Sequence, residues 1–124
     1  MQENSILTNS MEDYLEAIST LKQKKKYVRV KDIAKQMKVK MPSVTGALRT
    51  LTERNLVRHE KYEYVELTEE GITIAEEIKR RHDLISKFLI QVLKVDTKTA
   101  EQDACGIEHS VSQKTVEQLV KLVE

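Results

Sequence analysis

The chain has 124 residues, 40% of them hydrophobic and 33% charged, which is enough for one compact unit with a small second subdomain and too apolar for a disordered tail. Three glycines and one proline leave little room for a β fold with many turns, and no apolar run approaches the ~20 residues that span a bilayer. The polar amino terminus lacks a signal-peptide pattern and Cys105 is the sole cysteine, so we expect a cytoplasmic protein without an internal disulfide.

The net charge of +1 hides an uneven distribution along the chain. Residues 21–61 include 13 lysines and arginines but only three acidic residues, a net charge of +10, whereas the rest of the chain carries −9. A solvated lysine-rich face would account for residues 22–26 alone. The whole basic block instead indicates a polyanionic partner such as a nucleic acid.

The first half of the chain has the periodicity of short amphipathic helices. A first helix is predicted from a cap at Asn9 or Ser10 to the lysine-rich run that ends at residue 26. A second helix follows at about 31–37 and a third at about 42–54, with Pro42 in the first turn, where its missing N–H costs nothing. The positions predicted to be buried are Met11, Tyr14, Leu15, Ile18, Leu21, Ile33, Ala34, Met37, Val44, Leu48 and Leu51.

Strand-like residues then precede a longer helical region. Residues 56–67 predict a two-stranded hairpin with its turn near Glu60 and Lys61. Three helices are predicted after the hairpin. The fourth helix of the chain runs from about 69 to 93, the fifth runs from a cap at Asp96 or Thr97 to about 109, and the sixth begins at a cap at Ser112.

A hairpin directly after two helices joined by a short turn is typical of a winged helix-turn-helix, whose recognition helix enters the major groove of DNA. The predicted fold is therefore mostly α: a winged helix-turn-helix over 1–70, followed by an α-helical dimerisation domain over 71–124. For Ser43 and Thr45, simple capping and solvent exposure is the alternative interpretation. The residues predicted to contact DNA are Lys40, Pro42, Ser43, Thr45, Gly46 and Arg49 on the third helix, and Arg58, His59 and Lys61 on the wing.

A second informative pattern lies in the acidic second half of the chain. Cys105, Glu108 and His109 stand at i, i+3 and i+4, so on a helix they share one face, and Glu101 lies one turn earlier on the same side. A thiolate, a carboxylate and an imidazole together form a partial transition-metal site. Further ligand candidates are Asp13 and Glu16 on the first helix and His82 on the fourth.

Each of these residues also has an ordinary structural interpretation when it is taken alone. Asp13 and Glu16 would form a solvated acidic face, His82 would be a surface or core residue, and Cys105 would be a small buried hydrophobe.

Six segments stand along the chain in this order: MEDYLEAI (11–18), VRVKDIAKQMKV (28–39), SVT (43–45), LTEEG (67–71), RRHDL (80–84) and GIEHSVS (106–112). Their order is that of the diphtheria toxin repressor family of metal-dependent regulators, and the chain resembles most closely the manganese transport regulator branch of that family. Together they cover nearly the whole chain. The resemblance implies a homodimer that binds a double-stranded DNA operator, with one or two metal ions held between the first helix and the dimerisation helices.

The resemblance also implies a ligand set. Carried over position by position, the residues that fall on ligand positions of the manganese branch are Asp13, Glu16, His82, Glu108 and His109. Where that branch has a glutamate, this chain has Cys105, which resembles the iron-responsive branch instead. Carboxylates favour Mn²⁺ and a thiolate favours Fe²⁺, Co²⁺ or Zn²⁺, so the expected cofactor is Mn²⁺ or Fe²⁺, with Co²⁺ and Zn²⁺ as further alternatives.

Other positions depart from the family pattern. Ser86 stands where iron-responsive relatives place a glutamate ligand, so their second site is not reproduced. Gly46 replaces a long polar side chain that reads bases in some relatives, so the operator sequence is not inherited from them. The SH3-like domain of longer relatives is not expected, because the sequence ends at Glu124.

The chain is therefore predicted to be a metal-dependent transcriptional repressor that controls metal-homeostasis genes. Its predicted dimer surface includes Val111, Val116, Leu119 and Val120. The main alternative is a winged-helix regulator that responds to a non-metal effector. A metalloenzyme is a second alternative, but the sequence has no H-E-x-x-H motif, glycine-rich phosphate loop or nucleophile elbow, and we expect no enzymatic activity. The basic block argues against a third alternative, a winged helix that binds only proteins.

Overall fold

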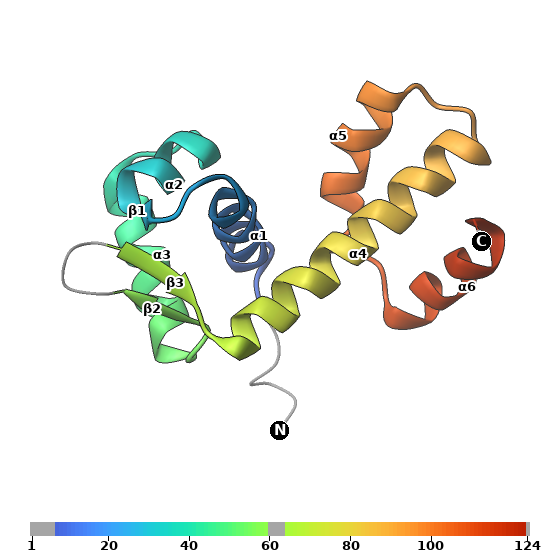
Figure 1. Cartoon of the computed structure of the whole chain (residues 1–124). Coiled ribbons are helices and arrows are strands. Elements are labelled where there is room, and N and C mark those ends of the chain that lie inside the picture. The colour runs from blue at the N-terminus through green and yellow to red at the C-terminus, as the bar shows by residue number, and fades with distance from the viewer. Residues whose placement is uncertain (1–6, 60–63, 124) are drawn as a thin grey trace. The chain divides into compact units, whose positions relative to one another are not determined.

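The computed structural model describes residues 7–59 and 64–123, and their fold is mostly α-helical, as predicted (Figure 1). The chain forms two compact units, Met1–Glu76 and Glu77–Glu124, and the boundary falls inside the helix α4 (Glu69–Gln91). Among the described residues, no helix is long and apolar enough to cross a membrane.

The first unit begins with the helices that the sequence predicted: α1 (Asn9–Lys24), α2 (Val30–Met37) and α3 (Met41–Glu53). The predicted cap of α1 is wrong, because Asn9 and Ser10 lie inside the helix. The hydroxyl of Thr8 accepts a hydrogen bond from the amide of Met11 at 3.1 Å, and Thr8 has the extended backbone of a capping residue. Pro42 stands in the first turn of α3, as predicted.

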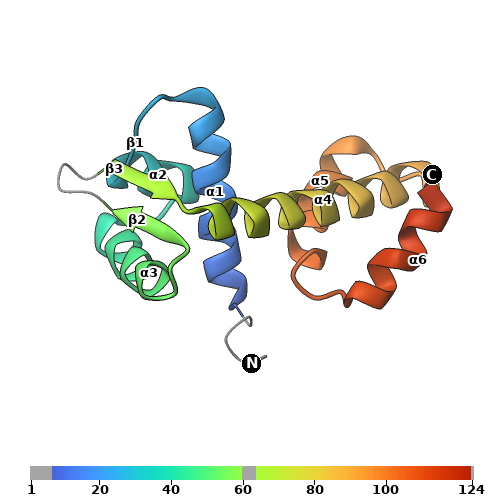
Figure 2. The ribbon, with the colours of Figure 1, turned by 60° about the horizontal axis from the view of Figure 1, so that its bottom comes forward.

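A small antiparallel sheet completes the first unit. Its strands are β1 (Val28–Arg29), β2 (Val57–His59) and β3 (Tyr64–Leu67), and they lie in the order β1-β3-β2 (Figure 2). The predicted hairpin corresponds to β2 and β3, and its predicted turn at Glu60 and Lys61 lies outside the described residues. Strand β1 was not predicted, because two residues are too few to show a strand period.

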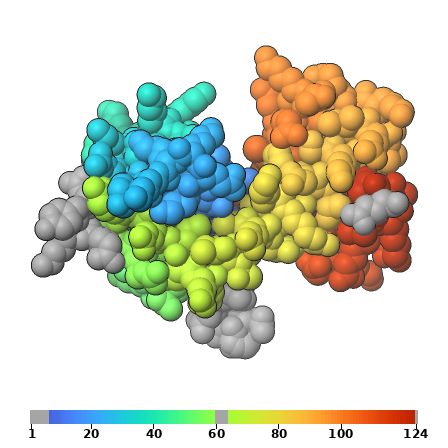
Figure 3. Space-filling view, in the orientation of Figure 1, coloured from blue at the N-terminus to red at the C-terminus, as the bar shows by residue number. Residues whose placement is uncertain are grey.

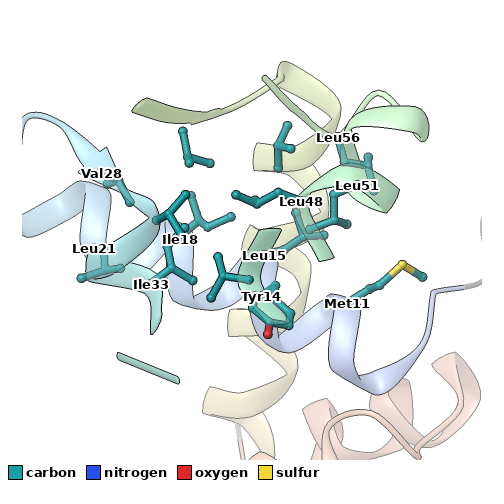
Figure 4. Close-up of a cluster of buried hydrophobic side chains, with 14 of the residues drawn as sticks. Met11, Tyr14, Leu15, Ile18, Leu21, Val28, Ile33, Leu48, Leu51 and Leu56 are labelled. Carbon is teal, nitrogen blue, oxygen red and sulfur yellow. The ribbon is translucent and has the colours of Figure 1, made fainter. Parts of the chain in front are cut away.

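The core of the first unit is formed by the apolar faces of its helices and the inner face of the sheet (Figure 4). Leu15 and Ile18 of α1 and Leu48 of α3 are almost fully buried, as the helical periodicity predicted. Val28 and Val65, which face each other on β1 and β3, are buried with them. These side chains fix the orientation of α3 relative to the hairpin within this unit.

Gly71 is required where the sheet ends and α4 begins. A Cβ atom on Gly71 would lie 2.1 Å from the carbonyl oxygen of Leu56, which is backbone and has no rotamer to change. The hydroxyl of Thr68 accepts a hydrogen bond from the Gly71 amide and donates one to the carbonyl oxygen of Asn55. The LTEEG segment therefore joins the hairpin tightly to α4.

The second unit contains the remainder of α4, followed by α5 (Thr97–Ile107) and α6 (Gln113–Val123) (Figure 1). Asp96 caps α5 as predicted, with its carboxylate accepting from the Thr99 amide at 3.0 Å. The core of this unit is formed by Ile85, Leu89, Ala100 and Ala104.

The assignment of Val116 to the dimer surface is wrong. This side chain has no exposed surface within the single chain, because α6 turns its apolar face inward. Val111 and Leu119 also pack against the core of the second unit and are only half-buried there. The hydrophobic stripe of α6 therefore serves first to hold the helix on its own chain.

Candidate metal centre and nucleic-acid interface

Three of the predicted metal ligands come together within the second unit. His82 lies on α4, Cys105 lies in the last turns of α5, and Glu108 directly follows that helix. One donor atom from each of these residues lies within 4.8 Å of the other two. Helical spacing brings Cys105 and Glu108 to one side, and the packing of α5 on α4 brings His82 to them.

Both ring nitrogens of His82 contact carboxylates. Nδ1 lies 2.7 Å from Oε1 of Glu108, and Nε2 lies 2.7 Å from Oε1 of Glu101. The second oxygen of Glu101 accepts a hydrogen bond from the Ser86 hydroxyl at 2.8 Å. The sequence analysis left Glu101 and Ser86 out of the site, although Glu101, Cys105 and Glu108 have the spacing of one helical face.

These contacts change the protonation of the two groups. Burial lowers the pKa of His82, but hydrogen bonds to Glu101 and Glu108 and their negative charges outweigh it, and the net shift is upward. The pKa of Glu101 is lowered by its hydrogen bonds to His82 and Ser86, which outweigh its desolvation. The geometry therefore favours a charged imidazole beside charged carboxylates when no other cation is present.

Glu108 is the most deeply placed carboxylate of the centre, with 1% of its surface exposed. The Nε2 atom of the buried His109 lies 3.4 Å from its Oε2 atom, and Nη1 of Arg81 donates to its carbonyl oxygen at 2.9 Å. A buried carboxylate needs positive charge or hydrogen-bond donors nearby. A carboxylate, a thiol and two imidazoles form a donor set that fits a divalent transition-metal ion.

Asp13 and Glu16, the other two predicted ligands, belong to the first unit. Both lie on α1 and are partly buried, and their i, i+3 spacing places them on one face of that helix. In the sequence they flank Tyr14 and Leu15, which are buried in the core.

The predicted DNA-contacting residues of α3 are all on its surface. Lys40 occupies the N-cap position of the helix, and residues 42, 43, 45, 46 and 49 are exposed. On the wing, Arg58 and His59 are also exposed, with Nη2 of Arg58 at 3.9 Å from a carboxylate oxygen of Glu66, and Lys61 lies outside the described residues. A Cβ atom on Gly46 would meet nothing within 4 Å, so the fold itself does not require glycine there.

A cationic and aromatic cluster beside the first residue of β3, at the turn end of the hairpin, was missed by the sequence analysis. The rings of Tyr27 and Tyr64 stack with their centroids 4.6 Å apart, and the guanidinium of Arg29 lies 5.2 Å from the Tyr64 ring. Nη2 of Arg29 also donates to the Tyr64 hydroxyl at 3.4 Å. Only the pairing of β1 with β3 places Arg29 opposite Tyr64.

The lysine-rich end of α1 adjoins this cluster. Residues 22–27 are exposed, and Figure 3 shows this blue segment on the surface of the first unit. The ammonium of Lys26 lies 5.6 Å from the centre of the Tyr27 ring. The basic block therefore forms a surface that suits a polyanion.

Two family models together match most of the chain. The model described as "iron dependent repressor, N-terminal DNA binding domain" matches residues 6–65. The model described as "iron dependent repressor, metal binding and dimerisation domain" matches residues 68–124.

Individual relatives agree with these matches. An uncharacterised HTH-type transcriptional regulator of Methanocaldococcus jannaschii is 34% identical over 119 residues, with 95% of each chain covered. The HTH-type transcriptional regulator MntR of Bacillus subtilis is 37% identical over 117 residues, which cover 94% of this chain and 82% of MntR.

Among solved structures, the manganese regulator SloR is similar with a TM-score of 0.80 and 33% identity. The alignment covers 90% of this chain and 52% of SloR, so the chain spans about half the length of that structure.

Proposed function

This chain belongs to the family of iron-dependent repressors, and we propose that it is a transcriptional repressor whose binding to DNA depends on a divalent metal ion. The resemblance to the diphtheria toxin repressor family and its manganese branch, inferred from six segments of the sequence, is confirmed. The observation that carries the proposal is the convergence of His82, Cys105 and Glu108 in a chain that also carries a winged helix-turn-helix.

We assign the metal to the side chains of His82, Cys105, Glu108 and the adjacent His109. The buried carboxylate of Glu108 and the thiol of Cys105 support this assignment, because a divalent cation would supply the positive charge that a thiolate and a carboxylate need when they converge. The resemblance alone supports Asp13 and Glu16 as further ligands from α1. We assign no catalytic reaction to the centre.

We propose that α3 enters the major groove, where Ser43, Thr45 and Arg49 face the bases and Arg58 faces phosphate. In a homodimer the two recognition helices would be spaced by about one turn of DNA, roughly 34 Å. We expect the repressor in the cytoplasm, together with the DNA that it binds. Its targets would be genes of metal homeostasis.

The proposal is tested by DNA binding with and without metal. Duplexes are selected from a random pool by protein loaded anaerobically with Fe²⁺ or Mn²⁺, and their affinity is then measured in metal and in chelator. We expect tight, salt-sensitive binding only with metal. Equal affinity in chelator would favour a regulator that responds to a non-metal effector.

The site assignment is tested with a nearly isosteric change. Glu108→Gln should abolish the metal response while the protein stays folded, because it removes the negative charge at the centre. Asp103→Asn is the matched control, since Asp103 is an exposed acid on α5, the helix that Glu108 directly follows. A full metal response in Glu108→Gln would contradict the assignment.

The identity of the metal is tested at Cys105. Cys105→Glu should move the preference from Fe²⁺, Co²⁺ and Zn²⁺ toward Mn²⁺, because it replaces a soft thiolate by a hard carboxylate. Metal affinities ranked by competition titration check this. An unchanged ranking would mean that the Cys105 sulfur does not bind the ion.

A further inference from the structure

The carboxylate of Glu101 forms hydrogen bonds with two side chains of α4, at the Nε2 atom of His82 and at the hydroxyl of Ser86. The Nε2 atom of His82 lies 2.7 Å from Oε1 of Glu101, and the Ser86 hydroxyl donates to Oε2 at 2.8 Å. Ser86 is 5% exposed and lies on α4 one turn after His82, so its position is fixed by packing. Glu101 projects from α5, and the three residues therefore tie two helices together.

The two nitrogens of His82 face different surroundings. Nδ1 is on the side of Glu108, whose side chain is fully buried, whereas Nε2 is on the side of Glu101, whose side chain is 54% exposed. His109 lies beside Glu108 on this buried side, with its Nε2 atom 3.4 Å from Oε2 of Glu108. The sulfur of Cys105 lies within 4.8 Å of donor atoms of both His82 and Glu108. Nδ1 is therefore the nitrogen that faces the larger donor set.

A histidine binds a metal through one nitrogen only when the other carries the proton, and a carboxylate that accepts this proton fixes both the tautomer and the orientation of the ring. We propose that Glu101, anchored by Ser86, is a positioning residue that accepts the Nε2 proton of His82 and so presents Nδ1 to the metal. This inference rests on the proposed function, because it assigns a role within the same centre.

The geometry separates this role from direct ligation. Glu101 lies at the opposite ring nitrogen from Glu108, and both of its oxygens already have partners on α4. A glutamine at this position keeps an oxygen that accepts from His82 but is a much poorer metal ligand. An alanine at this position can neither accept the proton of His82 nor bind a metal ion.

The test is an anaerobic Co²⁺ titration of the full chain, followed by the visible absorption of the bound ion. In Glu101→Ala we expect a 10–100-fold loss of Co²⁺ affinity with an unchanged number of bound ions, as is typical when a partner of a ligating histidine is removed. Glu101→Gln should retain most of the affinity, and Ser86→Ala should lie between it and Glu101→Ala. Asp103→Ala is the control for loss of one acidic charge from α5.

A second measurement determines which nitrogen of the His82 ring carries the proton. In Zn²⁺-loaded protein labelled with ¹⁵N histidine, the His82 proton should be on Nε2 in the parent chain and in Glu101→Gln, and should lose this hydrogen-bonded signature in Glu101→Ala. Glu101→Gln as weak as Glu101→Ala, or with fewer bound ions, would make Glu101 a ligand and overturn the proposal. An unchanged Co²⁺ affinity in Glu101→Ala would also overturn the proposal. Failure of the parent chain to bind Co²⁺ would instead overturn the proposed function itself.

Discussion

Gly71 and Gly46 both lie in helices, but only one of them is required by the fold. A Cβ atom at 71 would overlap the backbone carbonyl of Leu56, whereas one at 46 would stand in open space. Glycine inside a helix costs stability relative to alanine, because the unfolded chain has more freedom to lose. Gly46 therefore lowers the stability of α3 without any steric need within this chain.

The two glycines make opposite predictions for the free energy of unfolding. Gly71→Ala should lower it by about 1–3 kcal/mol, as other overpacked sites do. Gly46→Ala should raise it by about 0.5–1 kcal/mol. Urea unfolding of the metal-free protein checks both, and a Gly71→Ala protein as stable as the parent would contradict the close approach to Leu56.

His82 and Glu101 make a pH-dependent contribution to the stability of the metal-free protein. The raised pKa of His82 means that its contribution is complete below the ordinary value of 6.5 and is lost as the pH rises through the higher folded value. The lowered pKa of Glu101 means that its contribution is complete above 4.5 and is lost as the pH falls through the lower folded value. The pair is therefore most stabilising between these two ordinary values.

This pH dependence is tested by comparing the parent with His82→Gln in chelator. The parent should exceed the variant in free energy of unfolding by the largest amount between pH 4.5 and 6.5, and the difference should shrink at higher pH. Denaturant unfolding across this range is the measurement. A difference that grows as the pH rises above 6.5 would have the wrong sign.

At the scale of elements, α1 begins with a cap that the sequence pattern misplaced. Thr8, Asn9 and Ser10 are all good capping residues, and only the backbone conformation in the structure distinguishes them. Thr8→Ala should lower the free energy of unfolding by about 1 kcal/mol, because the amide of Met11 loses its acceptor. Asn9→Ala should have little effect, and thermal unfolding of both variants decides between the two positions.

The short strand β1 gives the DNA-binding unit a feature that the predicted hairpin lacked. It places Arg29 over Tyr64, so the guanidinium is held in place before DNA arrives. Arg29→Gln should weaken binding to all duplex sequences alike and reduce the salt slope by about 1, as expected for one phosphate contact. Lys98→Gln, an exposed site on α5, is the control, and equal salt slopes for the two variants would count against Arg29.

At the scale of the whole molecule, the second unit carries both the proposed metal centre and a set of exposed apolar side chains. With Val116 buried, the large hydrophobic residues still exposed in this unit are Val92, Leu93 and Leu122. Leu122 is the most exposed of them, at 61%. Exposed residues of this kind mark sites of protein association, which agrees with the dimerisation domain matched over 68–124.

Leu122→Glu should therefore convert the dimer to monomers and abolish operator binding, because a charge in a buried interface is strongly unfavourable. Sedimentation equilibrium measures the mass of the species. Ile72→Glu, at an apolar residue of the first unit that is 44% exposed, should leave the dimer intact. The reverse result, dissociation by Ile72→Glu alone, would place the dimer surface elsewhere.

Sequence patterns were sufficient to predict the order of the helices, the hairpin, most of the buried positions of the first unit and the family. Periodicity, capping residues and a basic block are properties of neighbouring residues. The sequence also placed Cys105 and Glu108 on one side, since helical spacing does so by itself. The packing of the folded chain was needed to show that His82 lies between Glu101 and Glu108, that Tyr27 stacks on Tyr64, and that Val116 is buried. Each of these depends on how one element packs against another, and sequence spacing carries no information about contacts between elements far apart in the chain.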